Sequence, residues 1–399
     1  MFPGSGRNTY NNYTPPQGAP PQQFQQQGYA PPPGAPQQYQ HQQNYGPPQG
    51  APQHYQQQQY YSGLPQVPSQ QGSYQRGNAT LPPTNPQSFG QNTGVTFQYS
   101  NCTGKKKALL VGINYFGTSN ELRGCINDVK NMGNFLVSNW GYKWEDIVVL
   151  TDDQDQMARR PYKNNVLRAM QWLVQDARPN DSLVFHYSGH GGLTEDLDGD
   201  EESGYDDVIY PLDFQQAGHI VDDDMHNIMV RSLPPGCRLT ALYDSCHSGT
   251  ALDLPYVYST KGVVKEPNLW KDAGTGALSA FMQYESGNIM GAVSSIGGLI
   301  KKATKLAPDR QQVINFKASP ADVISISGCK DDQTSADANE SGQSTGAMSW
   351  SFVKVLSEMP NQSYLSLLNN MRTLLKAKYS QKPQLSSSHP QDMNLAFIL

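Results

Sequence analysis

The apolar residues of this chain form short continuous runs that alternate with amphipathic stretches, and this pattern begins only near residue 105. Short continuous apolar runs are typical of strands buried on both faces, whereas a 3.6-residue apolar period is typical of helices. The predicted strands are 107–115, 147–150, 182–185, 238–243, 322–327 and 394–399, with a short extended piece at 207–211. The predicted helices are 125–138, 164–177, 222–230, 346–359 and 363–376. This alternation predicts an α/β domain whose mostly parallel sheet has helices on both faces.

Two long segments lack this periodicity. Residues 1–100 contain no Asp or Glu and are rich in Gln, Pro, Gly, Tyr and Asn, so we predict a disordered region followed by a folded domain at 101–399. Gln- and Asn-rich segments with interspersed Tyr are prone to self-association. Residues 255–320 are predicted to be irregular. Within them, 289–306 is compatible with a helix over the sheet edge, and its weak apolar face makes a membrane-surface role the poorer interpretation.

Charge and cysteine content narrow the class of protein. The net charge is −5, and all 34 acidic residues lie after residue 100, which argues against nucleic acid as a partner and is compatible with basic substrates. The five cysteines are scattered and form no C-x-x-C pair, which favours a reducing compartment over a disulfide framework. No apolar run has the length of a signal peptide core or a transmembrane segment. We therefore expect a soluble cytoplasmic monomer without a membrane partner, and a nuclear location is also compatible.

Two reactive side chains follow predicted strands directly. His190 lies just beyond the strand at 182–185, and Cys246 lies just beyond the strand at 238–243, each among Gly and Ser residues. Ligands of open α/β sheets bind at the carboxyl ends of the strands. If these strands are neighbours, the imidazole can take the thiol proton and leave a nucleophilic thiolate. We therefore predict a Cys–His dyad, with the N–H groups of Gly191 and Cys246 as the oxyanion hole.

The remaining histidines and the acidic runs are less specific. We interpret four histidines as structural or surface residues, namely His186, His219, His226 and His247. The run at 196–207 superficially resembles a calcium loop, but it lacks the glycine that an EF-hand requires at its sixth position. A second acidic run lies at 222–224. Residue chemistry alone leaves two interpretations open, a solvated acidic surface and a site for a hard cation or a basic ligand.

At these residues the chain resembles the caspase-fold cysteine peptidases, and specifically the type I metacaspases of the fungal, yeast type. The motifs that carry the resemblance are HYSGHGG at 186–192, DSCHSG at 244–249, VDDD at 221–224, GINY at 112–115 and LRGCIND at 122–128. The match spans roughly 103–399. The Gln-, Pro- and Tyr-rich region before it is similar to the prodomain of fungal members. The resemblance implies a caspase-like fold.

The resemblance also implies a function for particular residues. It implies peptide-bond hydrolysis after Arg or Lys in protein substrates, with Cys246 as the nucleophile and His190 as its partner. The positions that shape the primary specificity pocket correspond to Asp128, Ser188 and Asp244. Two carboxylates in one pocket select a cationic side chain and repel an acidic one. The calcium ligands correspond to Asp206, Asp222, Asp223 and Asp253, with the neighbouring Asp207 and Asp224 as substitutes. Ca²⁺ is therefore the expected cofactor, and roles in cell death and protein quality control are expected.

Self-processing is a further prediction, because such a peptidase would meet basic residues in its own flexible segments. The N-terminal region offers only Arg7 and Arg76, so we expect removal of this region at Arg76 or at Lys105 and the two lysines after it. A second cut is predicted in the irregular segment. Its basic residues are Lys301, Lys302, Lys305, Arg310 and Lys317.

The sequence is also compatible with another member of the same cysteine-peptidase clan. The Gln- and Tyr-rich arm is also typical of an interaction module that joins protein aggregates independently of catalysis. A nucleotide-binding α/β domain is disfavoured, because no glycine-rich phosphate loop follows the first strand.

Overall fold

The structure is a computed structural model of the 399-residue chain. It describes residues 79–89, 96–195, 205–245, 251–258, 317–329, 337–340, 343–376, 379 and 381–399. Cys246, His247, Arg76 and the basic residues at 301–310 lie outside the described residues, as do the helix suggested at 289–306 and most of the N-terminal region.

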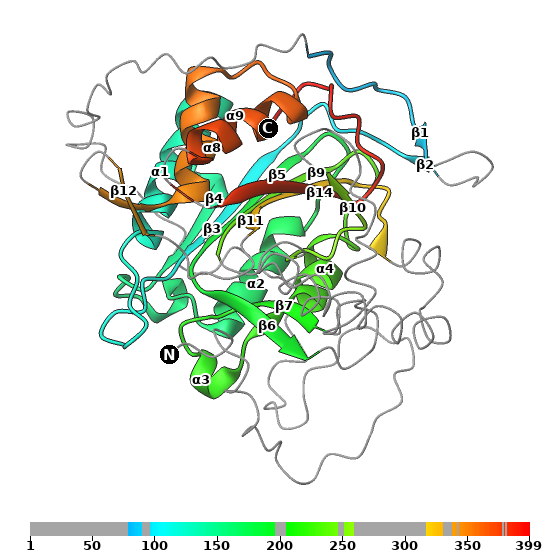
Figure 1. The fold of residues 1–399 in the computed structure, drawn as a ribbon. Helices are drawn as coiled ribbons and strands as arrows, with labels where there is room; N and C mark the ends of the chain where they lie inside the picture. The colour runs from blue at the N-terminus through cyan, green and yellow to red at the C-terminus, as the bar shows by residue number, and fades with distance from the viewer. Residues whose placement is uncertain are drawn as a thin grey trace, which may run out of the picture.

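A seven-stranded sheet forms the centre of the molecule, in the order β10-β14-β11-β9-β5-β3-β4 (Figure 1). The strands are β3 (Lys106–Gly112), β4 (Ile147–Thr151), β5 (Ser182–Ser188), β9 (Arg238–Asp244), β10 (Tyr256–Tyr258), β11 (Asp322–Cys329) and β14 (Lys382–Ser387). β4, β3, β5, β9 and β11 are mutually parallel, and β14 runs antiparallel to both β11 and β10. The predicted, mostly parallel α/β sheet is therefore confirmed.

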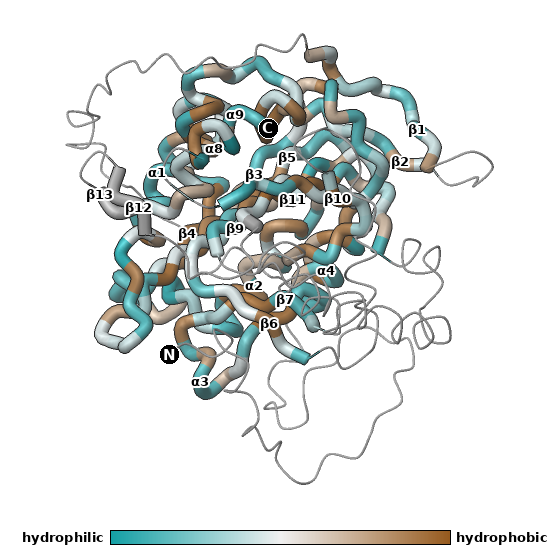
Figure 2. Tube along the Cα trace, in the orientation of Figure 1, coloured by the Kyte–Doolittle hydropathy of each residue, from teal (hydrophilic) through white to brown (hydrophobic). Residues whose placement is uncertain are grey.

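Helices cover both faces of this sheet (Figure 1). α1 (Cys125–Trp140), α8 (Ala347–Glu358) and α9 (Tyr364–Lys376) pack on one face, and α2 (Lys163–Val174) and α4 (Asp222–Met229) pack on the other. Each helix layer closes a separate apolar core against the central strands, and Figure 2 shows the hydrophobic strand residues between the two layers. This burial on both faces explains why the strands read as continuous apolar runs.

A second, three-stranded sheet extends beyond the carboxyl ends of β5 and β9. It contains β6 (Gly191–Glu195), β7 (Tyr205–Ile209) and β8 (Ile220–Val221), and the short helix α3 (Phe214–Ala217) lies between β7 and β8. β12 (Asp337–Glu340) and β13 (Gln343–Gly346) form a hairpin that leads into α8. The loops and small sheets at this edge provide the backbone on which the functional side chains are placed.

Two predicted strands differ from the structure, and one strand was not predicted. The predicted closing strand 394–399 makes only isolated bridges through Leu395 and Ala396, and the strand that completes the sheet is β14. The β14 sequence KPQLSS has no apolar run, because Gln384 and two serines fill three of its five buried positions. The first strand ends at Gly112 rather than at residue 115, and the residues beyond it form a loop of the site.

The ordered chain also begins before residue 100. Gln87–Ser88 (β1) and Thr96–Phe97 (β2) pair with each other, and the Phe97 and Tyr99 side chains are buried against the domain. The Phe97 ring stacks on His389 at 3.9 Å between centroids. These residues precede the predicted domain boundary at residue 100, and a few aromatic side chains suffice to attach them to the core. Among the described helices, none has the length and apolar composition needed to cross a membrane.

Candidate active site

The candidate active site lies where β5 and β9 end side by side. These strands pair in parallel, and Ser188 at the end of β5 is directly opposite Asp244 at the end of β9. His190 follows two residues after Ser188, and Cys246 follows two residues after Asp244. The strand adjacency that a Cys–His dyad requires is therefore present. Cys246 itself lies outside the described residues.

The His190 ring is half-buried and held by backbone and side-chain contacts. Its Nε2 atom lies 2.8 Å from the backbone carbonyl oxygen of Asn120. A carbonyl only accepts hydrogen bonds, so Nε2 carries the proton and Nδ1 carries the basic lone pair of the neutral imidazole. The His190 N–H donates to the Tyr115 hydroxyl at 3.1 Å, and the Tyr115 ring lies 4.8 Å from the imidazole. This arrangement fixes one tautomer and stabilises the imidazolium that forms when Nδ1 accepts a proton.

The loop that carries Tyr115 and Asn120 is itself fixed by side chains. The Asn114 N–H donates to the Asp152 carboxylate at 2.9 Å, and the Asn114 side-chain oxygen accepts from the N–H of Cys125 at the start of α1. Tyr115 has a φ of 52°, a left-handed conformation that is uncommon outside glycine. The roles of Asn114, Tyr115 and Asn120 were not predicted. Asn114 and Tyr115 belong to the GINY motif, but neither this motif nor a polar residue after a buried strand identifies a hydrogen-bond partner.

Tyrosine hydroxyls occupy the space beneath the His190 turn. Tyr187 donates to the His190 carbonyl at 2.7 Å, and its hydroxyl lies 3.2 Å from that of Tyr115. A Cβ atom on Gly189 would lie only 2.6 Å from the Tyr187 hydroxyl oxygen, so a side chain at position 189 would displace it. Burial raises the pKa of Tyr115 and of Tyr187, so both remain neutral hydrogen-bonding groups.

Strand pairing sets the direction of the Gly191 N–H group. Just before β6 and just after β7, the Tyr210 N–H donates to the His190 carbonyl at 3.2 Å. Hydrogen-bonded and non-hydrogen-bonded pairs alternate in an antiparallel ladder. The next pair, Gly191 with Ile209, therefore directs the Gly191 N–H away from β7.

The three predicted pocket residues lie together and form what we call the acidic pocket (Asp128, Ser188 and Asp244). All three are buried, and the Ser188 hydroxyl donates to Asp128 Oδ2 at 2.7 Å. The Gly346 N–H donates to both Asp128 carboxylate oxygens at 2.8 and 2.9 Å, and the Ser349 N–H donates to Asp244 Oδ2 at 2.7 Å. The start of α8 thus supplies donors that the sequence analysis did not foresee.

A buried histidine supports this arrangement. His186 Nε2 lies 2.8 Å from the Ser349 hydroxyl, and burial lowers the pKa of His186 to about 3, so the ring is neutral. The structural interpretation of His186 fits this position. His226 is likewise buried, with Nδ1 3.0 Å from the Leu252 carbonyl, and burial lowers the pKa of the partly exposed His219.

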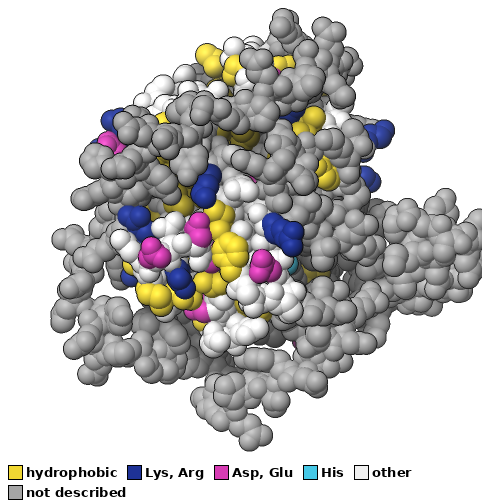
Figure 3. Space-filling view, turned by 90° about the vertical axis from the view of Figure 1, so that its left-hand side faces the viewer, with side chains coloured by type: hydrophobic (Ala, Val, Ile, Leu, Met, Phe, Trp, Pro, Cys, Tyr) yellow, Lys and Arg dark blue, Asp and Glu magenta, His cyan; other side chains and the backbone are white. Residues whose placement is uncertain are grey.

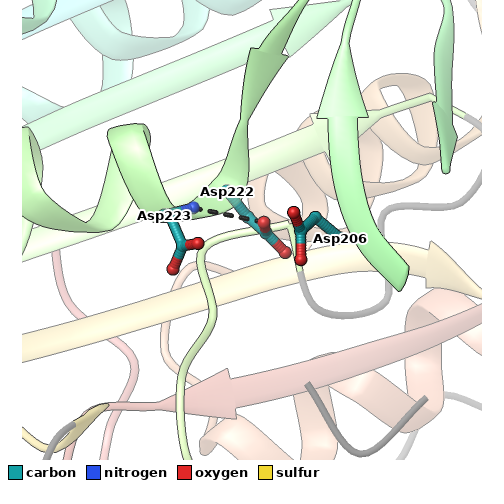
Figure 4. Close-up of side chains that lie close together, drawn as sticks. All are labelled: Asp206, Asp222 and Asp223. Carbon is teal, nitrogen blue, oxygen red and sulfur yellow. Dashed lines mark hydrogen bonds between the residues drawn. The ribbon is translucent and has the colours of Figure 1, made fainter. Parts of the chain in front are cut away.

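A second acidic group, the acidic cluster, contains Asp206, Asp222 and Asp223. Asp206 lies in β7 and the other two begin α4, and each offers one carboxylate oxygen within 4.8 Å of the others (Figure 4). Asp222 accepts the N–H groups of Asp207 and Asp223 at 3.1 Å each. The set is entirely of oxygen donors, which is the chemistry that Ca²⁺ prefers, and it sits at a helix N-terminus that favours negative charge.

The fourth predicted calcium ligand does not join this cluster. Asp253 Oδ1 lies 2.7 Å from the Lys317 ammonium, and both side chains are 7% exposed. A buried, paired cation is poorly placed to enter another active site, so this structure does not favour Lys317 among the predicted processing sites, and its use stays a prediction. Lys105 differs, since its side chain is 61% exposed and its ammonium lies 3.8 Å from Asp146.

Sheet order, the His190 turn and the neighbouring strand end together define a caspase-like α/β peptidase fold. Residues 106–255 match the family described as the metacaspase, peptidase C14 domain. The whole chain is 70% identical to the whole of Metacaspase-1 from Scheffersomyces stipitis and 68% identical to the whole of Metacaspase-1 from Meyerozyma guilliermondii. A crystal structure of caspase-1 from Spodoptera frugiperda aligns with a TM-score of 0.41 and 10% identity, over 79% of this chain and 98% of that one.

The chain belongs to the metacaspase family, as a type I member of the yeast type. It is therefore a cysteine-type peptidase.

Proposed function

We propose that the chain is an endopeptidase that cleaves after Arg or Lys. The observation that carries this proposal is the acidic pocket, in which the carboxylates of Asp128 and Asp244 are 1% and 3% exposed beside the His190 turn. A guanidinium or ammonium group would replace lost hydration with charge-assisted hydrogen bonds to both carboxylates. An acidic side chain would be repelled there and left without a donor of opposite charge.

The surface charge gives this proposal indirect support. Basic and acidic side chains are interspersed over the described part of the face in Figure 3, without an extended patch of one sign. On the described part of this face, no broad field of one sign would add to the attraction of a basic side chain by the buried carboxylates.

In the proposed reaction Cys246 attacks the carbonyl carbon of the scissile bond. His190 takes the thiol proton on Nδ1 and later donates it to the leaving amine, while its Nε2–H stays on the Asn120 carbonyl. The N–H groups of Gly191 and Cys246 would stabilise the oxyanion. Water then hydrolyses the thioester on Cys246 and regenerates the thiol.

We further infer that activity depends on calcium. Asp206, Asp222 and Asp223 would hold the ion, since their clustered carboxylates fit a hard cation. When bound, Ca²⁺ would neutralise their mutual repulsion and fix the start of α4 against β7. Asp253 would become a calcium ligand only if its carboxylate left its ion pair with Lys317 and bound the ion instead.

A self-processing zymogen completes the proposal, and the described residues favour one N-terminal cleavage site. The Lys105 carbonyl accepts the Ser182 N–H at 2.9 Å, and the Lys105 N–H donates to Asp181 at 2.7 Å. A cut after Lys105 would break this start of β3 and detach the buried Phe97 and Tyr99. We therefore favour Arg76 for removal of the N-terminal region, with the second cut among Lys301, Lys302, Lys305 and Arg310.

The test uses the full chain and its Cys246→Ala variant with three peptides that differ only in the residue before the scissile bond, Arg, Lys or Asp. We expect the full chain to cleave the Arg and Lys peptides only when Ca²⁺ is present, and a chelator to abolish this cleavage. Cys246→Ala should cleave none of the peptides. Preferential cleavage of the Asp peptide would refute the specificity. Full activity in chelator would refute the calcium requirement, and an intact chain after long incubation in calcium would refute self-processing.

We propose a second function for the N-terminal arm, the recruitment of the protein to aggregates. Peptidase activity and recruitment would each serve the proposed roles in cell death and protein quality control. The Gln- and Tyr-rich sequence of the arm is typical of segments that join aggregates. Because residues from 79 onward contact the domain, the arm should be deleted only to residue 78. Cys246→Ala protein that still joins aggregates, and deletion protein that does not, would support this function. Loss of recruitment in Cys246→Ala would refute its independence from catalysis.

A further inference from the structure

We propose that Gly346, at the start of α8, is a specificity-determining residue of the acidic pocket. Its N–H orients the Asp128 carboxylate, and its lack of a side chain leaves room for the Asp244 carboxylate beside it. A guanidinium or ammonium group can then reach both. This inference rests on the proposed cleavage after basic residues.

The hydrogen bonds show how the first turn of α8 organises the pocket. The Gly346 N–H reaches both oxygens of Asp128 at 2.8 and 2.9 Å, and the Ser349 N–H reaches Asp244 at 2.7 Å. The first N–H groups of a helix have no partner within the helix, and they carry the positive end of its dipole. These donors therefore hold the two carboxylates in fixed directions.

Space explains why position 346 requires glycine. A Cβ atom built on Gly346 would lie 2.2 Å from Asp244 Oδ2 and 2.7 Å from Asp128 Oδ2. Both contacts are far shorter than real Cβ contacts, so any side chain would push at least one carboxylate away. The same two distances place these two oxygens within about 5 Å of each other, close enough for one planar cation to contact both.

Backbone conformation does not explain the glycine. Gly346 has φ −75° and ψ 140°, values that any residue adopts. Its backbone also has little freedom to retreat, because a Cβ atom on Gly124 at the start of α1 would lie 2.9 Å from the Thr345 carbonyl carbon. Space for the two carboxylates is therefore the physical reason for glycine at this position.

The test is Gly346→Ala in the full-length protein, with two peptides that carry either Arg or its uncharged analogue citrulline before the scissile bond. We expect the ratio of kcat/KM for Arg over citrulline to fall by about tenfold or more, mainly through KM, because one charge-assisted contact is lost. The rate at which iodoacetamide alkylates the Cys246 thiol should stay at the wild-type value, since this small neutral reagent does not use the pocket.

Gly141→Ala is the matched control. Gly141 ends α1 with a φ of 72°, and a Cβ atom there would meet nothing within 4 Å. This variant is expected to lower the melting temperature through backbone strain while leaving the Arg-over-citrulline ratio unchanged.

The outcomes are distinct. A wild-type protein that does not prefer Arg over citrulline would overturn the proposed specificity together with this inference. A preference that survives in Gly346→Ala, or a loss that is equal for both peptides and accompanied by slower alkylation, would overturn the inference alone.

If Gly346→Ala does not fold, the steric account is tested by comparing melting temperatures in an Asp244→Ala background. The alanine at 346 should then lower the melting temperature far less, and an equal loss in both backgrounds would contradict the steric account.

Discussion

The acidic pocket and the acidic cluster both bury carboxylates, but they are built in different ways. In the pocket, donors from β5 and the start of α8 hold Asp128 and Asp244 in fixed directions. In the cluster, three carboxylates from β7 and α4 each offer an oxygen within 4.8 Å of the others, and Asp222 accepts the backbone N–H groups of Asp207 and Asp223. Two carboxylates directed by donors from other elements suit a cation with directional N–H groups, whereas three neighbouring carboxylates suit a spherical cation.

Asp253 represents a third arrangement, since its carboxylate is neutralised by the protein's own Lys317. Position in the fold, rather than the presence of Asp, therefore decides what a carboxylate does, and variants in each of the three arrangements test this.

Lys317→Ala should destabilise the protein most. It leaves the Asp253 carboxylate buried without its 2.7 Å partner, and breaking a buried pair in this way costs about 3–5 kcal/mol. Lys354→Ala is the matched control. It removes a lysine from the partly exposed pair with Glu358 and should cost roughly 0.5 kcal/mol or less. Urea unfolding in a chelator measures both, and equal effects would show that Asp253 does not depend on Lys317.

Asp244→Asn and Asp128→Asn should each lower kcat/KM for an Arg peptide by roughly ten- to 150-fold. A hydrogen bond to a charged group is worth about 1.5–3 kcal/mol. The calcium concentration for half-maximal activity should not change. Asp223→Asn is the contrasting variant, because it should alter the calcium response while keeping the Arg-over-citrulline ratio. If the pocket variants lost both peptides equally, the pocket would not be the specificity determinant.

Stability should fall as the pH is lowered below about 6.5, the usual pKa of histidine. Burial lowers the pKa of His186 to about 3, so the unfolded chain takes up a proton that the folded chain refuses. The resulting loss of folding free energy from His186 is small above pH 6.5. It grows as the pH falls towards 3 and reaches about 1 kcal/mol near pH 5.5. Chemical denaturation at several pH values measures it. His186→Gln should show a shallower decline, and an identical profile would assign the effect to other groups.

Asp206→Asn should have the smallest effect, and in the opposite direction. Removing one of three carboxylates that lie within 4.8 Å should stabilise the calcium-free protein by about 1 kcal/mol or less, because repulsion is relieved. Calcium should then raise the melting temperature less than it does in the wild type. The exposed Asp155, changed to Asn, is the control. A calcium response equal to that of the wild type would contradict the proposed site.

Local sequence patterns were sufficient for most of the fold. The parallel strands and the flanking helices follow from apolar period, since each element buries side chains at the spacing of its own geometry. The positions of His190, Asp128 and Asp244 near element ends were also visible. β14 was missed because a serine-rich strand has no apolar signature, and residues 394–399 were assigned in its place.

The residue types at the ends of the strands are visible in the chain, because these patterns are local. Their hydrogen-bond partners follow only from the packed domain. Gly346 reaches Asp128 across 218 residues of chain, and Asn120 reaches His190 across 70. Such contacts depend on the order and register of strands and on how closely two helix ends approach. These properties arise from packing the whole domain, so no local pattern of residues encodes them.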